Sequence, residues 1–304
     1  MGQQLLNAIF LGSIYALFAV GYTLVFGVLD VLNLAHSAVF MLGAVVAYSI
    51  VGLHGGPFWL GMLAALTVSA GMGLVIEFVA LRPLRRRGAP PLSALIATIG
   101  LALIIVALIE QSHAGGWLGW LWQDGANPVR FPPGSVPNPI LHVAGLIIPG
   151  DDIAIGIVTV ALMLILGWIV RATSVGRALR AVAENQRASR LMGIDVDRLF
   201  ALTLVGSSAL AGLAGVLFGL ALSDIDPYIG RDQVELRGLA IIVLGGMGSV
   251  TGAVVGGYLL AIIEVAVIVA GYTNLRAGVA FAALFLMLVL RPQGLFGSRV
   301  QERL

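Results

Sequence analysis

Long apolar runs alternate with short polar connectors along nearly the whole chain. Several runs reach the roughly 20 residues that a helix needs to cross the hydrocarbon layer of a bilayer, which is about 30 Å thick. The apolar segments are Leu5–Phe26, Ala38–Val51, Phe58–Leu81, Leu92–Ile109, Ile153–Val170, Leu199–Leu222, Leu239–Leu244, Val250–Ala270 and Ala277–Leu290. The pattern predicts a single-domain, all-α polytopic membrane bundle over residues 1–304, with about eight or nine transmembrane segments.

Clusters of arginine next to the apolar runs predict the orientation. They lie at residues 82–87, within 171–198 and at the C-terminus, and loops rich in basic residues stay in the cytoplasm. Residues 113–152 and 223–235 are then expected to be outside loops. The first of these loops holds three tryptophans, which favour an anchor at the membrane interface: Trp117, Trp120 and Trp122.

Residues 171–198 interrupt the apolar pattern with a strongly charged segment. It contains six Arg, two Asp and one Glu, nine of the 32 charged residues in the chain. Good helix formers predict a helix from Gly176, and Gly193 is expected to end it as a glycine just past the last turn. Two uses fit such a cytoplasmic helix: binding anionic lipid headgroups, or docking another protein.

Two Gly-rich or polar interruptions predict discontinuous helices. An odd number of crossings must join the second outside loop to the cytoplasmic C-terminus, but only two full-length runs follow that loop. The short stretch LRGLAIIVLGGMGSVTG is therefore expected to cross part of the membrane, and VLDVLNLAHS is similarly irregular. Broken helices at membrane depth line cavities or transport pathways. The pathway candidates are Asn33, His36, Gly245, Gly246, Gly248 and, from a later span, Glu264.

Glu77 and Glu264 are acidic residues within apolar runs, where a charge is costly and usually faces the bundle interior. Glu77 is expected to be structural, through a hydrogen bond or ion pair with a nearby Arg. For Glu264 both a structural contact and a pathway lining stay open. Gly248, Gly252 and Gly256 recur every fourth residue, which predicts one helix face for close packing.

The composition excludes several functions. The chain has no Lys, so it lacks the P-loop lysine that a Walker A ATPase needs, and it has no Cys for disulfides or thiolate chemistry. Its four His are far apart in sequence, and no catalytic motif is complete. We therefore expect a protein that is not an enzyme, with no metal, cofactor or nucleic-acid partner.

The charged loop also carries a family resemblance. GRALRAVAENQRASRLMGIDVDR resembles the branched-chain amino-acid ABC transporter permease family (LivH type), and SIYALFAVGYTLVFGVLDVLNLAHSAVFMLGA, VLGGMGSVTGAVVGG and LRPQGLFG resemble further family blocks in family order. The resemblance implies a fold like that of type II ABC-importer permeases. It also implies that the loop couples transport to an ATPase, through Arg177, Arg180, Ala183, Glu184, Asn185 and Gly193.

The resemblance further implies a set of partners. These are a second related permease subunit, two cytoplasmic ATP-binding subunits and an extracytoplasmic substrate-binding protein, in the lipid of a bacterial inner membrane. After NLAH the family usually continues with Gly and an acidic or polar residue, whereas Ser37 and Ala38 follow here. Urea, amides or other amino acids therefore stay open as substrates. A proton-coupled secondary transporter using Glu77 or Glu264, and a lipid-binding scaffold, are the alternatives of a different class.

Overall fold

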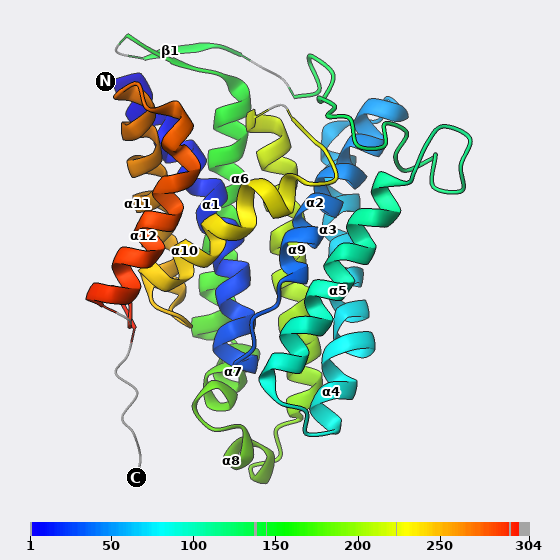
Figure 1. Cartoon of the computed structure of the whole chain (residues 1–304), viewed down its shortest axis with the longest axis vertical. Coiled ribbons are helices and arrows are strands. Elements are labelled where there is room, and N and C mark those ends of the chain that lie inside the picture. Colours follow the sequence, from blue (N-terminus) through cyan, green and yellow to red (C-terminus); the bar gives the residue numbers. More distant parts are fainter. Residues whose placement is uncertain (1, 137–138, 144, 223, 292, 298–304) are drawn as a thin grey trace.

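The computed structural model describes residues 2–136, 139–143, 145–222, 224–291 and 293–297 (Figure 1). Within them, eight helical runs are long and apolar enough to cross a membrane, which confirms the all-α membrane bundle. They are α1 (Gly2–Leu29), α2 (Ala35–Tyr48) with η1 (Ser49–Leu53), α3 (Phe58–Val75) with η2 (Ile76–Leu81) and α4 (Arg82–Arg86), α5 (Pro91–Glu110), α6 (Gly150–Ala172), α9 (Val196–Leu222), α11 (Val250–Val269), and η4 (Thr273–Leu275) with α12 (Arg276–Leu290).

The two ends of the bundle differ in character. One end, here the Arg-rich end, carries α4 together with the short helices α7 (Ser174–Glu184) and α8 (Gln186–Leu191) (Figure 1). The opposite end, here the hairpin end, carries the start of α1 and the strands β1 (Leu141–Val143) and β2 (Leu146–Ile148) (Figure 1). The strands pair antiparallel, with Leu141 opposite Ile148. By the distribution of arginines, the Arg-rich end is predicted to be cytoplasmic.

A first break separates α1 from α2. Asp30 adopts a left-handed conformation with φ 54°, which ends α1 near the Arg-rich end. The chain then runs back without helical structure to mid-height, where α2 begins (Figure 1). Only part of this crossing is helical, so the expectation of a discontinuous helix around VLDVLNLAHS is correct.

A second break involves the π-helical segment η3 (Ile229–Glu235) and α10 (Leu236–Gly245), which crosses the middle of the bundle obliquely (Figure 1). The seven residues of η3 continue directly into the ten of α10, and α10 itself spans about 15 Å at 1.5 Å per residue. The whole run is shorter than the roughly 20 residues that a full crossing needs. The expected half-helix is therefore present. The expected outside loop 223–235 is wrong beyond Tyr228, because the polar sequence from Ile229 onward is helical and packs against α2.

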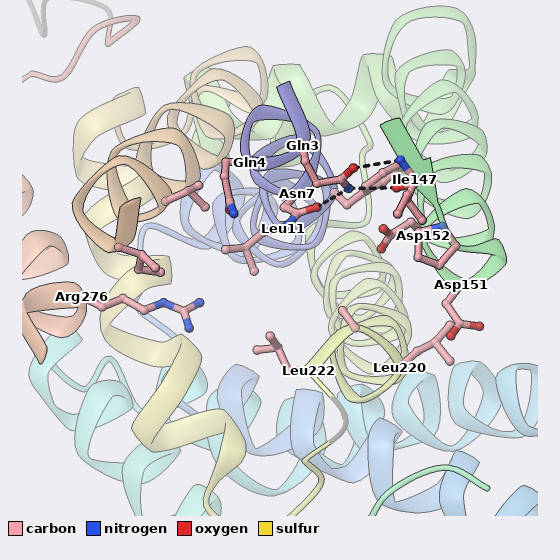
Figure 2. Close-up of a pocket in the computed structure, with 15 residues that line it drawn as sticks. Gln3, Gln4, Asn7, Leu11, Ile147, Asp151, Asp152, Leu220, Leu222 and Arg276 are labelled. Carbon is pink, nitrogen blue, oxygen red and sulfur yellow. Dashed lines mark hydrogen bonds between the residues drawn. The ribbon is translucent and has the colours of Figure 1, made fainter. Parts of the chain in front are cut away.

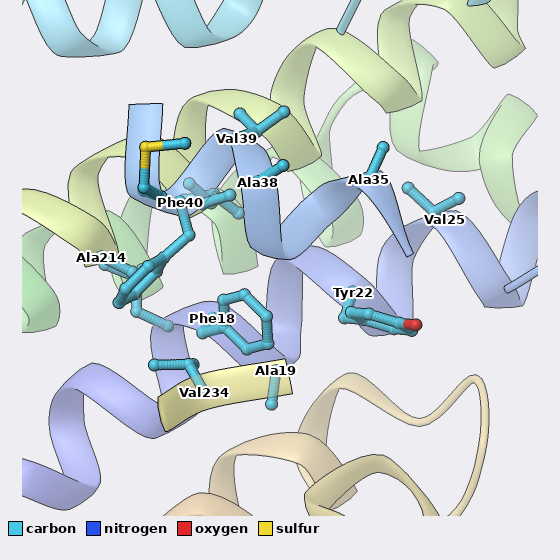
Figure 3. Close-up of a cluster of buried hydrophobic side chains, with 14 of the residues drawn as sticks. Phe18, Ala19, Tyr22, Val25, Ala35, Ala38, Val39, Phe40, Ala214 and Val234 are labelled. Atoms are coloured by element: carbon cyan, nitrogen blue, oxygen red, sulfur yellow. The ribbon is translucent and has the colours of Figure 1, made fainter. Parts of the chain in front are cut away.

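The core lies where α1, α2 and α9 pack together. Phe18 of α1 makes an edge contact with Phe40 of α2, with ring centroids 5.4 Å apart, and Phe40 makes a similar contact with Phe218 of α9. Figure 3 shows Phe18 and Phe40 next to Ala214 of α9 and Val234 of η3. Helices α5, α6 and α12 surround this core and expose many large apolar side chains, as expected for surfaces that face lipid or another membrane subunit.

Glycines bring α10 and α11 into close contact. A Cβ at Gly252 would overlap the carbonyl oxygen of Gly245, and one at Gly256 would lie 2.8 Å from the carbonyl oxygen of Ile241. The prediction of a face with three glycines needs one correction. Gly248 precedes α11 in the turn after α10, with φ +83°, so only Gly252 and Gly256 share that face.

Two further expectations are corrected near the bundle ends. Trp122 is fully buried against Tyr48, with ring centroids 5.7 Å apart, whereas Trp117 and Trp120 are exposed as an interfacial anchor would be. Residues 150–152, expected in the outside loop, already form the first turn of α6. The polar character of Asp151 and Asp152 explains the difference, because acidic residues are favoured in the first turn of a helix.

Candidate functional site

The Arg-rich end presents an exposed surface built by α7 and α8. The predicted single helix from Gly176 to Gly193 is in fact two helices, because Asn185 has an extended backbone and caps α8. Its side-chain oxygen accepts a hydrogen bond from the N–H of Ala188 at 2.9 Å. Gly193 follows α8 with φ +83°, as expected of a glycine after the last helical turn.

All six residues assigned to coupling are exposed on this surface: Arg177, Arg180, Ala183, Glu184, Asn185 and Gly193. Leu191 and Met192 stand beside them and are 85% and 83% exposed. Large apolar side chains so fully exposed next to charged ones are typical of a surface that another molecule covers. The structure thus places the predicted residues together, and their coupling role stays a prediction.

Contacts join this surface to the membrane bundle. Val182 on the opposite face of α7 is fully buried, and α7 packs against α1. Gln186 of α8 donates a hydrogen bond to the carbonyl oxygen of Val28 at 3.4 Å, just before the break that follows α1. Arg180 donates to the carbonyl oxygen of Val170 at the end of α6. A movement of α7 and α8 would therefore act directly on the end of α1, next to the first break.

An ion-pair network fixes the Arg-rich ends of α3 and α9. Glu77 is completely buried in η2, and one of its carboxylate oxygens lies 2.6 Å from the Arg85 guanidinium. Arg85 also binds Asp197 at 3.0 Å and covers the Phe200 ring, with 4.4 Å to the ring centroid. These contacts fit the structural role that the sequence indicates for Glu77.

The break between α1 and α2 is lined by buried polar groups. His36 is buried and lies 3.2 Å from both the Ser207 hydroxyl and the carbonyl oxygen of Phe18, and it packs between the Phe18 and Tyr22 rings. Asn33 is also buried, and both its amide nitrogen and its amide oxygen lack a hydrogen-bond partner among the described residues. An unpaired buried amide is costly, so it marks a place where water or a ligand group is expected.

Glu264 is the centre of a second buried network. It is fully buried in α11 and accepts hydrogen bonds from Arg237 of α10 at 2.7 Å, Arg276 of α12 at 2.9 Å and the Tyr15 hydroxyl of α1 at 3.0 Å. One carboxylate thus joins four helices at membrane depth. The sequence pointed to Glu264 alone, because its partners lie 12 to 249 residues away along the chain.

Arg276 also faces a cavity of about 660 Å³ at the hairpin end (Figure 2). The guanidinium lies on one side of this outer cavity, and Asp151 and Asp152 lie on the opposite side (Figure 2). Gln3 and Asn7 contribute amides from the first turns of α1, and the rest of the lining is mostly apolar. Sequence patterns do not indicate this cavity, because several segments far apart along the chain form it.

The glycine candidates for the pathway lie at the end of α10. Gly245 is packed against Gly252, and Gly246 takes φ +102° where the helix stops. Gly248 approaches Gly27 of α1. Backbone packing is tight around Gly245 and Gly246 and ordinary around Gly248, and a lining role for the three stays a prediction.

Two discontinuous helices that meet inside the bundle, with ionisable side chains buried beside them, are typical of membrane transport proteins. The sequence agrees with that class. Residues 4–290 match the family described as the branched-chain amino acid transport system / permease component. This match covers nearly the whole chain, so the protein belongs to that permease family.

Individual relatives match over almost their full length. The high-affinity branched-chain amino acid transport system permease protein LivH of Escherichia coli K12 is 36% identical, over 99% of this chain and 97% of the relative. BraD of Pseudomonas aeruginosa, a permease protein described in the same terms, is 34% identical over the same shares. A probable branched-chain amino acid transport permease protein LivH of Methanocaldococcus jannaschii is 29% identical, over 87% of this chain and 81% of the relative.

Proposed function

We propose that this chain is the membrane-spanning permease subunit of a binding-protein-dependent ABC importer for branched-chain amino acids. Membership of the permease family supports the class, and the LivH and BraD relatives support the substrate. The observation that carries the proposal is the exposed α7–α8 surface attached to the break after α1. The proposed location is a bacterial inner membrane.

The proposed partners supply functions that this chain lacks. It has no lysine for a P-loop, so two cytoplasmic ATP-binding subunits would supply the energy. They would dock on the α7–α8 surface, where Leu191 and Met192 supply apolar contact area and the arginines supply charge. A second, related permease subunit would complete the pathway, and an extracytoplasmic binding protein would deliver substrate at the hairpin end.

In this mechanism, ATP-driven movement of the motor subunits displaces α7 and α8. The displacement reaches Val28 through Gln186 and shifts the end of α1 relative to α2. Because α2 packs against η3, a shift of α2 also moves the start of the half-helix α10. The two discontinuous helices then alternate between positions open to either side of the membrane.

The coupling role is tested by replacing Glu184 with Arg and Gly193 with Val in the complete transporter. The first change reverses a charge on the docking surface, and the second is strained because Gly193 has φ +83°. We expect ATP-dependent uptake in proteoliposomes to be abolished while the subunit stays in the membrane. A Thr67→Val variant is the matched control, because it alters an exposed hydroxyl of α3 that hydrogen-bonds to the carbonyl oxygens of Leu63 and Ala64 in the same helix. Normal uptake by the double variant would refute the assignment.

The energy source distinguishes this proposal from proton-coupled transport. Vanadate-sensitive uptake and co-elution with an ATPase support the importer, whereas ATP-independent uptake that an uncoupler abolishes would overturn it. The contacts of Glu77 and Glu264 favour structural roles over proton carriage, because each carboxylate is fully buried and held by at least one guanidinium.

A further inference from the structure

A small cavity lies at mid-height between α2, α5 and η3. None of the residues that line it also lines the outer cavity. Its volume is about 200 Å³, below the roughly 300–1,000 Å³ of sites for drug-sized ligands. That size suits a small metabolite. The lining is mostly aliphatic and comprises Leu34, Ser37, Ala38, Met41, Ile99, Ala102, Leu103, Val106, Gly230, Arg231 and Glu235.

The two charged residues of this α2–α5–η3 cavity both come from η3. Glu235 is half-buried, and its carboxylate oxygen lies 3.0 Å from the Ser37 hydroxyl. Arg231 stands four residues earlier, and its guanidinium uses Nε to bind Asp232 at 2.8 Å. The bond to Asp232 uses only Nε, and the guanidinium lies over the Tyr228 ring, 5.2 Å from its centroid. The Arg231 side chain is half exposed, so its terminal nitrogens keep donors that a ligand can use. The cavity therefore offers one negative group and one positive group beside an aliphatic wall.

The position of these charges points to function. Gly230 allows η3 to approach α2 so closely that a Cβ there would overlap the carbonyl oxygen of Ser37. This contact places Glu235 and Arg231 beside the first turn of α2, where the two discontinuous helices meet. Ionisable residues at membrane depth are costly, and in transporters the substrate site lies near the midplane beside such helix breaks.

We propose that the α2–α5–η3 cavity binds the transported substrate, a zwitterionic α-amino acid with a branched aliphatic side chain. The Glu235 carboxylate accepts hydrogen bonds from the substrate ammonium, and Arg231 donates to its carboxylate. Met41, Leu103 and Val106 contact the aliphatic side chain. A lipid acyl chain would fill the apolar part but supplies no partner for Glu235. This inference rests on the proposed function and names the residues that would recognise its substrate.

Two neighbouring residues at the start of α2, Ser37 and Ala38, line the cavity on the side that faces η3. The Ser37 hydroxyl donates a hydrogen bond to the Glu235 carboxylate, which holds this carboxylate at the cavity wall. The small side chain of Ala38 occupies little of the space beside it.

Photolabelling with photo-leucine, a diazirine analogue of leucine, tests the proposal in the complete transporter in proteoliposomes. The complete assembly is needed because the cavity opens at the side of this chain. We expect labelled peptides within residues 34–41 and 99–106, with labelling prevented by excess leucine. Glu235→Gln should lower labelling and uptake by roughly tenfold or more, the effect of losing about 1.4 kcal/mol of binding. Thr67→Val should leave both unchanged.

Ala102→Leu is a second variant, which fills the cavity without touching a charge. It should lower photo-leucine labelling as well. The cavity can therefore still be tested if the Glu235→Gln subunit does not assemble into the transporter. Labelling of the outer cavity instead, or labelling of residues 34–41 that leucine does not compete with, would overturn the proposal. If wild-type transporter shows no ATP-dependent leucine uptake, the proposed function itself fails. Leucine uptake together with labelling elsewhere would refute only the assignment of the substrate to the α2–α5–η3 cavity.

Discussion

Glu264 shows how a single residue organises several helices. Its carboxylate is shared by two arginines and a tyrosine from α10, α12 and α1, all within 3.0 Å. Removing one member of a buried ionic network lowers the stability of the protein strongly, because the remaining charges stay buried without a partner.

We therefore expect Glu264→Gln to destabilise the protein by about 3–5 kcal/mol, because Arg237 and Arg276 lose their shared counter-charge. Thermal unfolding of the purified subunit in detergent measures the effect. Asp224→Asn is the control, since Asp224 belongs to an ion pair that is largely exposed and should change stability by less than about 1 kcal/mol. Equal transition temperatures for the two variants would contradict this account of Glu264.

The sequence identified some site residues and missed others for a clear reason. Asn33, His36 and Glu264 are conspicuous because they are polar within apolar runs. Glu235 ends the predicted outside loop, and Arg237 lies in the first turn of the predicted half-helix, where a charge next to a loop is expected to be exposed, so the burial of these two residues could not be predicted. Their environment depends on contacts with α11 and α2, and hydrophobic periodicity carries no information on such long-range contacts.

At the scale of elements, glycine spacing determines how closely the half-helix α10 packs on α11. Gly252 of α11 lies against the backbone of Gly245, and neither position has room for a methyl group. The close approach lets the two backbones meet along most of the length of α10.

Gly252→Ala should consequently separate α10 from α11 and destabilise the protein by about 1–3 kcal/mol, the usual result of overpacking. Gly100→Ala in α5 is the matched control, because a Cβ at Gly100 meets no neighbouring atom within 4 Å. In the control, the better helix propensity of Ala should leave stability unchanged or slightly higher. The comparison uses thermal unfolding, and a neutral Gly252→Ala would show that the two helices can separate without loss.

The sequence predicted most elements but placed two of them incorrectly. Long apolar runs specify membrane helices almost alone, because the bilayer requires about 20 apolar residues. The division between α7 and α8 was missed, since Asn185 acts as a cap only if the backbone is extended there. The helical segment η3 was also missed, because its polar sequence is typical of a loop. It is helical where it packs against α2, a contact that the local sequence does not indicate.

For the molecule as a whole, the lack of cysteine makes the orientation simple to test. Ala183, on the α7–α8 surface, and Ala126, in the loop at the hairpin end, are exposed positions for single cysteines. With a membrane-impermeant maleimide we expect the Ala126→Cys variant to react in intact spheroplasts and the Ala183→Cys variant to react only in inverted vesicles. The opposite pattern would reverse the assignment of the cytoplasmic side.

The end of α10 depends on residues that are synthesised well after it. The N–H groups of Leu295 and Phe296 donate to the carbonyl oxygens of Leu244 and Gly245, each at 2.9 Å. These are helix-terminal carbonyls that α10 cannot satisfy by itself. The turn is made about 50 residues after α10, a delay of roughly 3–10 s at 5–20 residues per second. During that interval the C-terminal carbonyls of α10 lack these two donors, so we expect the docking of this end to be completed only after the turn has been made.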